Sequence, residues 1–360
     1  MENNVLTLHP TPPFDFNKTL DFLEGFSPTR DEQSLAARVL TKAILVAGQV
    51  VVFQVKSSGT VEAPRLECTL HSEQPLNAAA LAAARDRLSF FLSLDDDLRP
   101  FYAIAQADPA MAPEVQRLYG LHQVKFPTPF ENAAWAVLSQ RAPIPVARKM
   151  KQAVVERFGS RLTLDGVVYW AFPEAAALAA VPVAELAAVI HHERKAKYLA
   201  AVAAAFANAD ADEAFLRAGD YEAVLAWLRG INGIGEWSAD FILLRGLGRM
   251  QRLHFTPDTI FERRMSTAVS RVYASAPGRA LSGKEMRPIA ERYGDTQGYW
   301  ALYLRTGESA GWSPNWPEKL VGSGQKAASI GQRAEGSEQK VVGSRQRAEG
   351  SRQDTPSWVA

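Results

Sequence analysis

The chain has 360 residues, of which 47% are hydrophobic and 22% charged, and its formal net charge is +1. This composition indicates a soluble globular protein, and the length suits one large domain or two to three smaller ones. The nearly neutral charge excludes a basic surface overall, so any nucleic-acid partner would have to bind at one local face. The single cysteine, Cys68, excludes intramolecular disulfides and cysteine-ligated zinc or iron–sulfur centres.

The N-terminal residues do not resemble a targeting signal, because no basic region precedes an apolar core. No uninterrupted apolar run is long enough to span a membrane. We therefore expect an intracellular, cytoplasmic protein without a membrane partner.

Residues 1–76 alternate apolar and polar side chains over short stretches, as half-buried strands do. Asp15 precedes a stretch with helical spacing and is expected to cap a helix that ends near Gly25. We expect a small antiparallel α+β domain with one or more helices on one face of its sheet, in a structural or flanking role. The expected strands lie at 5–8, 49–56 and 66–70.

From residue 77 the hydrophobic period becomes helical, and we expect an all-α bundle of short helices with short links. Asn77 is placed to cap the first helix. Thr128 and Pro129 predict another helix start, with Glu131 completing a capping box. The expected domains are the α+β domain at 1–76, helices at 77–118 that pack with the C-terminal lobe, and helical domains at 119–232 and 233–317.

Further helices are predicted along the rest of the folded part, and Asp220 is expected to cap one of them. Beyond residue 317 the composition shifts to small and charged residues in a degenerate seven-residue repeat, without the apolar positions of a coiled coil. We expect residues 318–360 to be a disordered tail. The predicted helices span 98–105, 146–158, 173–179, 183–190, 193–207, 221–230, 259–274, 284–293 and 299–305.

A glycine hairpin stands between two of these helices. Gly233 and Gly235 flank Ile234, and an apolar helix begins near Glu236. The glycines permit positive φ angles and a close approach of a phosphate oxygen to backbone N–H groups, while the helix dipole favours an anion. Ile234 would anchor the turn in the core. We interpret Gly233, Ile234 and Gly235 as a phosphate-binding hairpin, and a plain helix–helix turn is the alternative.

Asp258 follows a predicted cap, Thr256, and a proline at the first helical position, Pro257. The helix dipole favours its ionised form, which could stabilise positive charge that develops on a sugar as a base leaves, or could orient a water. An acidic residue that merely stabilises a helix start is the alternative. We interpret Asp258 as the catalytic residue because the phosphate-binding hairpin is near it in the sequence.

Four aromatic residues are candidates for the walls of a pocket that holds a flipped base: Trp237, Phe241, Trp300 and Tyr303. Trp237 and Phe241 are four residues apart and share a helical face. A role in the core is an equally good interpretation of each aromatic residue.

Gln140 and Arg141 end a predicted helix just before Pro143, and could fill the gap that an extruded nucleotide leaves. A solvated loop is the alternative. Several arginines near the hairpin could contact phosphates, although scattered surface arginines are common. These are Arg245, Arg249, Arg252, Arg263 and Arg264.

At these residues the chain resembles the helix-hairpin-helix (HhH-GPD) DNA glycosylase superfamily, and within it the bacterial 3-methyladenine DNA glycosylase II type. The resemblance implies an N-terminal antiparallel α+β domain and two helical domains with the active-site cleft between them. It also implies base flipping, with the catalytic aspartate at Asp258, the hairpin at Gly233 and Gly235, and the intercalating element at Gln140–Arg141. The matching segments are ENAAWAVLSQR (131–141), ERKAKYL (193–199), LRGINGIGEWSADFILLRG (228–246), TPDTIFERR (256–264) and GWSP (311–314).

The chain also departs from the family pattern. Bifunctional members have a nucleophilic lysine two residues after the last hairpin glycine, where this chain has Trp237. The stacking tryptophan near the family's C-terminal helix falls at Thr306, so Trp300 or Tyr303 would have to replace it. The family's wedge is apolar, whereas Arg141 is not.

The sequence therefore predicts a monofunctional DNA N-glycosylase for alkylated bases, which binds damaged double-stranded DNA, acts as a nucleoid-associated monomer and needs no cofactor or metal. Water would be the nucleophile, since a Schiff base requires an amine. One alternative is a glycosylase for oxidised or deaminated bases. The other is a non-catalytic protein that binds damaged DNA through the hairpin.

Overall fold

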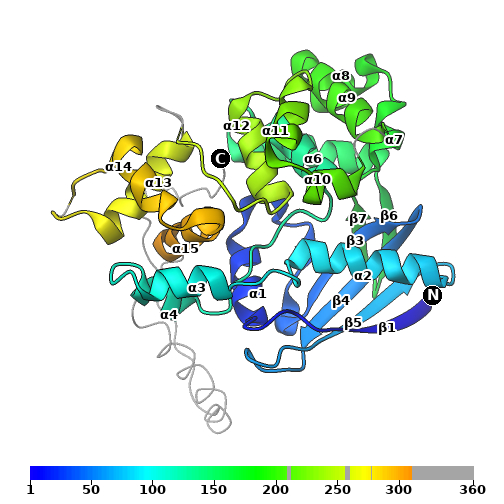
Figure 1. Cartoon of the computed structure of the whole chain (residues 1–360). Coiled ribbons are helices and arrows are strands. Elements are labelled where there is room, and N and C mark those ends of the chain that lie inside the picture. The colour runs from blue at the N-terminus through cyan, green and yellow to red at the C-terminus, as the bar shows by residue number, and fades with distance from the viewer. Residues whose placement is uncertain (209–211, 256–259, 277, 310–360) are drawn as a thin grey trace, which may run out of the picture.

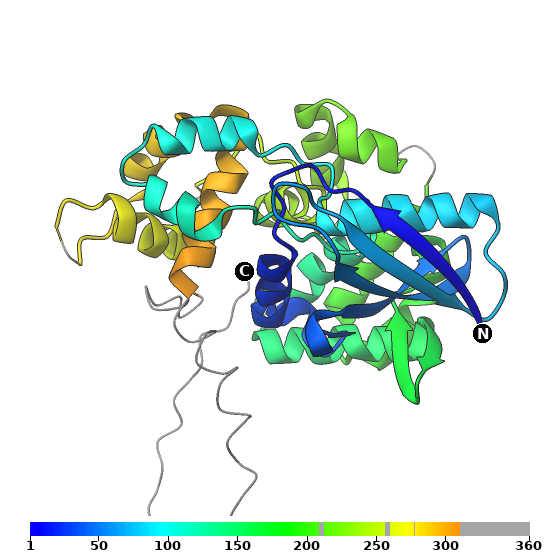
Figure 2. The same ribbon diagram turned by 90° about the horizontal axis from the view of Figure 1, so that it is seen from below.

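The computed structural model describes residues 1–208, 212–255, 260–276 and 278–309. An antiparallel sheet with helices α1 and α2 lies beside two groups of helices, and the three parts are visible in Figure 1 and, from below, in Figure 2. The fold is therefore α+β, as the sequence predicts. No helix in the described ranges combines the length and the hydropathy that crossing a membrane requires.

The N-terminal sheet has the strand order β1-β5-β4-β3-β2, with every neighbouring pair antiparallel. Its core includes Phe53 of β4 and Cys68 of β5, both fully buried. Burial raises the pKa of the Cys68 thiol to about 12, so this thiol is not a nucleophile at neutral pH. The elements are β1 (Glu2–Leu8), α1 (Phe16–Gly25), η1 (Ser27–Thr29), β2 (Gln33–Ser34), η2 (Ala36–Arg38), β3 (Leu40–Val46), β4 (Gln49–Ser57), β5 (Leu66–Ser72) and α2 (Ala78–Leu92).

The first group of helices, here called the hairpin lobe, surrounds the almost entirely buried helix α5. Asp220 caps α11 by accepting the Ala223 N–H at 2.9 Å, as predicted. A two-stranded sheet, β6 with β7, interrupts the helices and corrects the prediction of an all-α bundle. The elements are α5 (Pro129–Ser139), α6 (Ile144–Phe158), β6 (Ser160–Leu164), β7 (Val167–Ala171), α7 (Ala175–Ala179), α8 (Val183–Ile190), α9 (Glu193–Ala207), α10 (Glu213–Ala218), α11 (Tyr221–Gly230), α12 (Glu236–Phe241) and the π-helical segment η4 (Ile242–Gly246).

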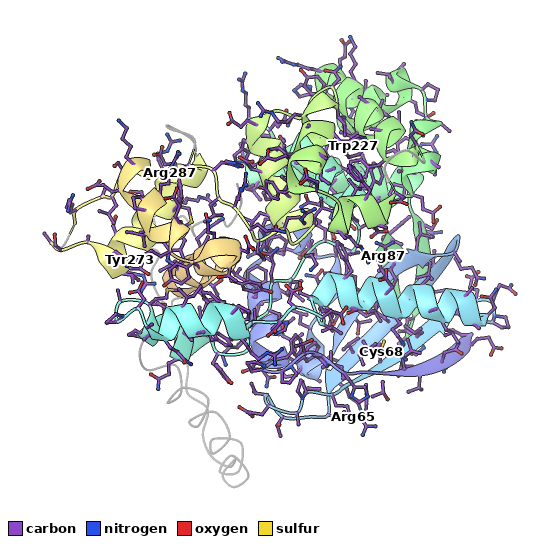
Figure 3. The ribbon with its side chains drawn as sticks, in the orientation of Figure 1. Arg65, Cys68, Arg87, Trp227, Tyr273 and Arg287 are labelled. Carbon is purple, nitrogen blue, oxygen red and sulfur yellow. The ribbon has the colours of Figure 1, made fainter. Side chains whose placement is uncertain are left out.

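The second group, here called the C-terminal lobe, joins helices that are distant in the sequence. Helices α3 and α4 share a core with α13, α14 and α15. Figure 3 shows Tyr273 and Arg287 in this lobe, apart from Trp227 of the hairpin lobe and Cys68 of the sheet. The elements are α3 (Arg99–Gln106), α4 (Ala112–Leu118), α13 (Ile260–Tyr273), α14 (Gly283–Glu291), η5 (Gly294–Thr296) and α15 (Gln297–Ser309).

The packing of the described residues differs from the predicted domain boundaries at two places. Helix α2 was expected to join the C-terminal lobe, but Leu88 and Phe91 bury it against the N-terminal sheet. The hairpin was expected to open the C-terminal domain, but Ile234 and Ile242 pack in the core of the hairpin lobe. The tail at 318–360 lies outside the described residues.

Candidate functional site

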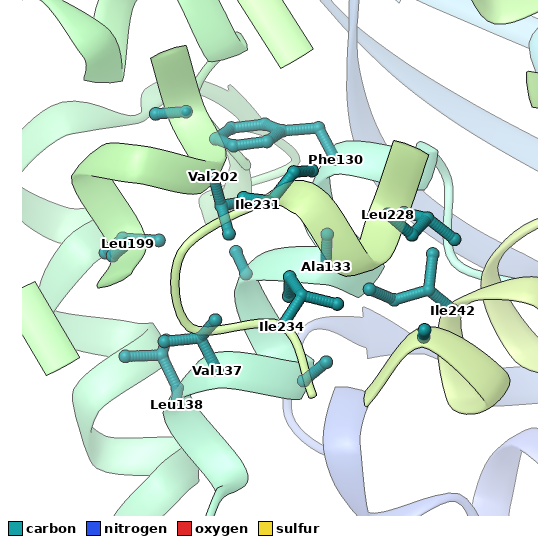
Figure 4. Close-up of a cluster of buried hydrophobic side chains, with 14 of the residues drawn as sticks. Phe130, Ala133, Val137, Leu138, Leu199, Val202, Leu228, Ile231, Ile234 and Ile242 are labelled. Atoms are coloured by element: carbon teal, nitrogen blue, oxygen red, sulfur yellow. The ribbon is translucent and has the colours of Figure 1, made fainter. Parts of the chain in front are cut away.

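The hairpin begins where α11 ends at Gly230. The Ile234 N–H donates to the Ile231 carbonyl at 3.0 Å and closes the turn. Ile234 is buried with Leu228 and Val137 (Figure 4), so its side chain anchors the hairpin in the core, as the sequence predicts. The turn is thus held from the inside, and its backbone is left at the surface.

The two hairpin glycines have different roles. Gly233 has φ +97°, and a Cβ there would lie 2.4 Å from the Tyr198 ring. Gly235 has φ −89° and is exposed, and a Cβ there would meet nothing within 4 Å. Of the two glycines, Gly233 alone uses the positive φ that glycine permits. Gly233 is required by the fold, whereas Gly235 leaves open space in front of the backbone.

The open space at Gly235 coincides with the start of α12. Gly235 is the N-cap and offers no side chain, and its carbonyl accepts the Ala239 N–H at 2.9 Å. The N–H groups of the first turn therefore have no acceptor within the helix. An anionic oxygen could fill this space and accept them, although Glu236 in the same turn is an opposing negative charge.

Substituting each glycine in turn should distinguish an effect on the stability of the fold from an effect on DNA binding. Gly233→Ala should cost about 1–2 kcal/mol of unfolding free energy for the left-handed backbone alone, with the Tyr198 clash in addition. Gly235→Ala should change stability by no more than about 0.5 kcal/mol but weaken DNA binding, since its methyl group occupies the space that a phosphate oxygen would use. Urea unfolding and fluorescence anisotropy with a labelled duplex measure the two effects. Equal loss of stability in both variants would contradict the assignment.

Helix α12 places an aromatic pair directly after the hairpin. Trp237 and Phe241 are both half-buried, with ring centroids 5.4 Å apart and an interplanar angle of 18°. Phe241 also packs against the cluster that contains Phe26 and Trp135. The aromatic pair thus packs against a buried cluster and remains partly exposed to solvent. A planar ligand could stack on such a surface.

The end of helix α5 is attached to the hairpin. The Gln140 Nε2 donates to the Gly233 carbonyl at 2.7 Å and to the Ser238 Oγ at 3.0 Å. Arg141 follows with φ +48° and an exposed side chain. Of the two predicted wedge residues, Gln140 is already engaged with the hairpin, and Arg141 is the one that projects into solvent.

A histidine–aspartate pair that no sequence pattern indicates joins helix α12 to the segment that follows η4. The Nδ1 of His254 is 2.7 Å from Oδ1 of Asp240, and Asp240 stands between Trp237 and Phe241 on α12. The hydrogen bond to Asp240 is the largest cause that raises the pKa of His254 above its ordinary value. The two residues are fourteen positions apart, so helical or strand spacing gives no signal for their contact.

Comparison with known proteins agrees with this geometry. Residues 134–280, which include α12 and the hairpin, match the family model of the HhH-GPD superfamily base excision DNA repair protein. Over these residues the chain is similar to the HhH-GPD superfamily.

Two relatives of this chain are DNA-3-methyladenine glycosylases by name. The one from Bacillus subtilis is 26% identical over 249 residues, which are 68% of this chain and 80% of the relative. DNA-3-methyladenine glycosylase 2 of Escherichia coli is 27% identical over 186 residues, 52% of this chain and 59% of the relative. Both relatives are thus glycosylases by name, and the matching family model is that of a base excision DNA repair protein.

Solved structures show the same fold. The 3-methyladenine DNA glycosylase of Archaeoglobus fulgidus has a TM-score of 0.65 and 24% identity, and the match covers 83% of this chain and 97% of that one. The 8-oxoguanine glycosylase/lyase of Clostridium acetobutylicum with DNA has a TM-score of 0.59 and 18% identity, with 84% and 95% covered. At these identities the likeness establishes the fold alone.

Two of the predicted pocket aromatics lie in the core of the C-terminal lobe. Trp300 and Tyr303 are both 0% exposed. The Trp300 Nε1 donates to the Tyr273 hydroxyl at 3.2 Å, and the Tyr303 hydroxyl donates to the Leu121 carbonyl at 3.1 Å. Because a flipped base needs an accessible ring, the pocket interpretation of these two residues is corrected to a core role.

The arginines near the hairpin mostly serve the fold. The Arg245 guanidinium lies 5.1 Å from the centroids of Phe22 and Phe26, and burial lowers its pKa to about 9. Buried Arg249 donates to the Gly219 carbonyl at 2.9 Å. Arg252 pairs with Glu222 at the surface. The expectation of phosphate contacts is therefore wrong for the buried Arg245 and Arg249.

The predicted catalytic residue, Asp258, and its predicted cap, Thr256, lie outside the described residues. The described chain stops at Phe255, which is buried in the C-terminal lobe, and continues with α13. The role of Asp258 therefore remains a prediction from the sequence.

Proposed function

We propose that this chain is a monofunctional DNA N-glycosylase that releases alkylated bases of the 3-methyladenine type from duplex DNA. The observation that carries the proposal is the structure of the hairpin and α12 as one unit. The open space at Gly235 suits a DNA phosphate, and the stacked Trp237 and Phe241 follow within two turns of helix. The names of the two relatives favour 3-methyladenine as the type of substrate.

In the proposed reaction the hairpin holds the backbone of a bent duplex, and Arg141 occupies the gap left by the flipped nucleotide. The base lies against the Trp237–Phe241 pair. The bond between C1′ of the sugar and the base nitrogen breaks, and its electron pair leaves with the base. Ionised Asp258 stabilises the positive charge that develops on the sugar, and water adds at C1′ with loss of a proton.

Trp237 determines the class of reaction in this proposal. It occupies the position where bifunctional members have their lysine, and an indole nitrogen cannot form a Schiff base. An alkylated purine such as 3-methyladenine already carries positive charge in DNA, so it leaves with little help from an acid. One carboxylate then suffices for the chemistry.

Duplexes that each carry one defined lesion test the proposal, together with DNA treated with a methylating agent. We expect release of methylated purines, detected by chromatography, and at least about tenfold slower release of 8-oxoguanine and hypoxanthine. Preferred release of 8-oxoguanine would favour the alternative of a glycosylase for oxidised bases. Tight binding of damaged duplexes without release of any base would favour the non-catalytic alternative.

A further inference from the structure

The His254–Asp240 pair connects two parts of the molecule that pack in different cores. Asp240 belongs to α12, whose neighbouring residues Ala239 and Ile242 are buried in the hairpin lobe. His254 is followed by Phe255, which is buried in the C-terminal lobe. The 2.7 Å hydrogen bond therefore attaches residues 250–255, which connect the two lobes, to α12, the helix that carries the stacked aromatic pair.

Other polar contacts also hold residues 250–255, and the Gly298 N–H donates to the Met250 carbonyl at 2.9 Å. The Leu253 N–H donates to the Gln297 side chain at 3.3 Å, and Arg252 pairs with Glu222 where both side chains are exposed. Surface ion pairs of this kind contribute little to the stability of the fold. Asp240 and His254 are more enclosed, with side-chain exposures of 22% and 36%. The His254–Asp240 hydrogen bond is thus better enclosed than the Arg252–Glu222 pair of the same segment.

The surroundings of His254 are acidic. Asp240 and Glu236 face it from α12 and Glu222 faces it from α11, while Arg252 offsets Glu222. The hydrogen bond and these carboxylates outweigh burial and raise the pKa of His254 above its ordinary 6.5. The imidazolium is fully present below pH 6.5, and its charge is lost as the pH rises through the raised pKa.

We propose that His254 is a positioning residue, whose hydrogen bond to Asp240 fixes residues 250–255, which precede Asp258 in the sequence, against the helix carrying Trp237 and Phe241. The proposal rests on the proposed function, because Asp258 follows His254 by four residues and is the reacting carboxylate there. A charged hydrogen bond is about twice as strong as a neutral one. Base release should therefore slow as His254 loses its proton.

The first test compares single-turnover rates of base release from methylated DNA between about pH 5.5 and 9. We expect His254→Ala to be about tenfold slower at low pH with an unchanged Kd for the duplex, as for loss of alignment. His254→Gln keeps an N–H donor without the charge, so it should recover part of the rate and lose the alkaline decline of the wild type. His9→Gln, at an exposed histidine of the N-terminal segment, is the matched control. A His254→Gln profile that declines like the wild type would overturn the proposal.

The second test does not depend on activity, and separates this proposal from the proposed function. Hydrogen exchange of the segment around residues 250–255 should show lower protection in His254→Ala and in Asp240→Asn, and protection in the wild type should fall as the pH rises through the His254 pKa. Unchanged protection in both variants would overturn the positioning role. If the wild type released no base from any duplex, the proposed function would fail, while this measurement would still decide whether His254 anchors the segment.

Discussion

Asp258→Asn should abolish base release and leave DNA affinity within about twofold of the wild type, because the amide keeps the shape of the carboxylate but not its charge. Removing one preorganised group that stabilises a developing charge slows catalysis by roughly 10²–10³-fold, and we expect at least this loss. Single-turnover release of methylated bases measures the rate, and anisotropy with a labelled duplex measures the affinity.

Asp295→Asn is the matched control for this variant. Asp295 is exposed in η5 of the C-terminal lobe, so the same chemical change there should leave the rate of release unaltered. Full activity in Asp258→Asn would contradict the proposed mechanism, and equal loss of DNA binding and of release would indicate a folding defect instead.

Lys151→Met should be the most destabilising substitution in the described core. The Lys151 Nζ lies 2.6 Å from a carboxylate oxygen of Glu131 and 2.6 Å from one of Glu32, and Lys42 is 2.9 Å from the other Glu32 oxygen. The contacts attach the N-terminal domain to helices α5 and α6. Removing one partner of a buried charged pair costs about 3–5 kcal/mol, because the opposing charge is left uncompensated. Urea unfolding should show this loss.

Lys149→Met is the control, since Lys149 is exposed on the same helix and should change stability by less than about 0.5 kcal/mol. The pH dependence gives a second check. Burial favours a higher pKa for Glu32, but Lys151 and Lys42 hold it below its usual value. Glu32 therefore stabilises the fold above the ordinary pKa of 4.5, and this contribution is lost as the pH falls through the lower folded-state pKa. A Lys151→Met variant as stable as Lys149→Met would refute the importance of the network.

Local sequence signals predicted most of the helices correctly. Asp15, Asn77, Thr128 and Asp220 all accept backbone N–H groups at the helix starts where the sequence places them. Glu131 is the exception, because its carboxylate pairs with Lys151 instead of completing a capping box. A capping pattern indicates a helix start, but a buried lysine from a distant helix decides what the carboxylate contacts.

Features that depend on tertiary packing were not predicted. The β6–β7 strands are five residues each, too short to stand out against helical neighbours. The burial of Trp300 and Tyr303 follows from their contacts with Tyr102, Tyr273 and Leu121, which come from other parts of the chain. The hairpin and the Trp237–Phe241 pair were predictable because their residues are close in the sequence.

The integrity of the DNA strand after base release shows whether water or a protein amine attacks the sugar. The wild-type protein is incubated with a methylated duplex, and the strands are separated with and without alkali and heat. We predict released base and an intact strand that breaks only after alkali, with no covalent complex trapped by borohydride. Strand scission by the protein alone, or a trapped complex, would contradict the role assigned to Trp237 and the hydrolytic mechanism with it.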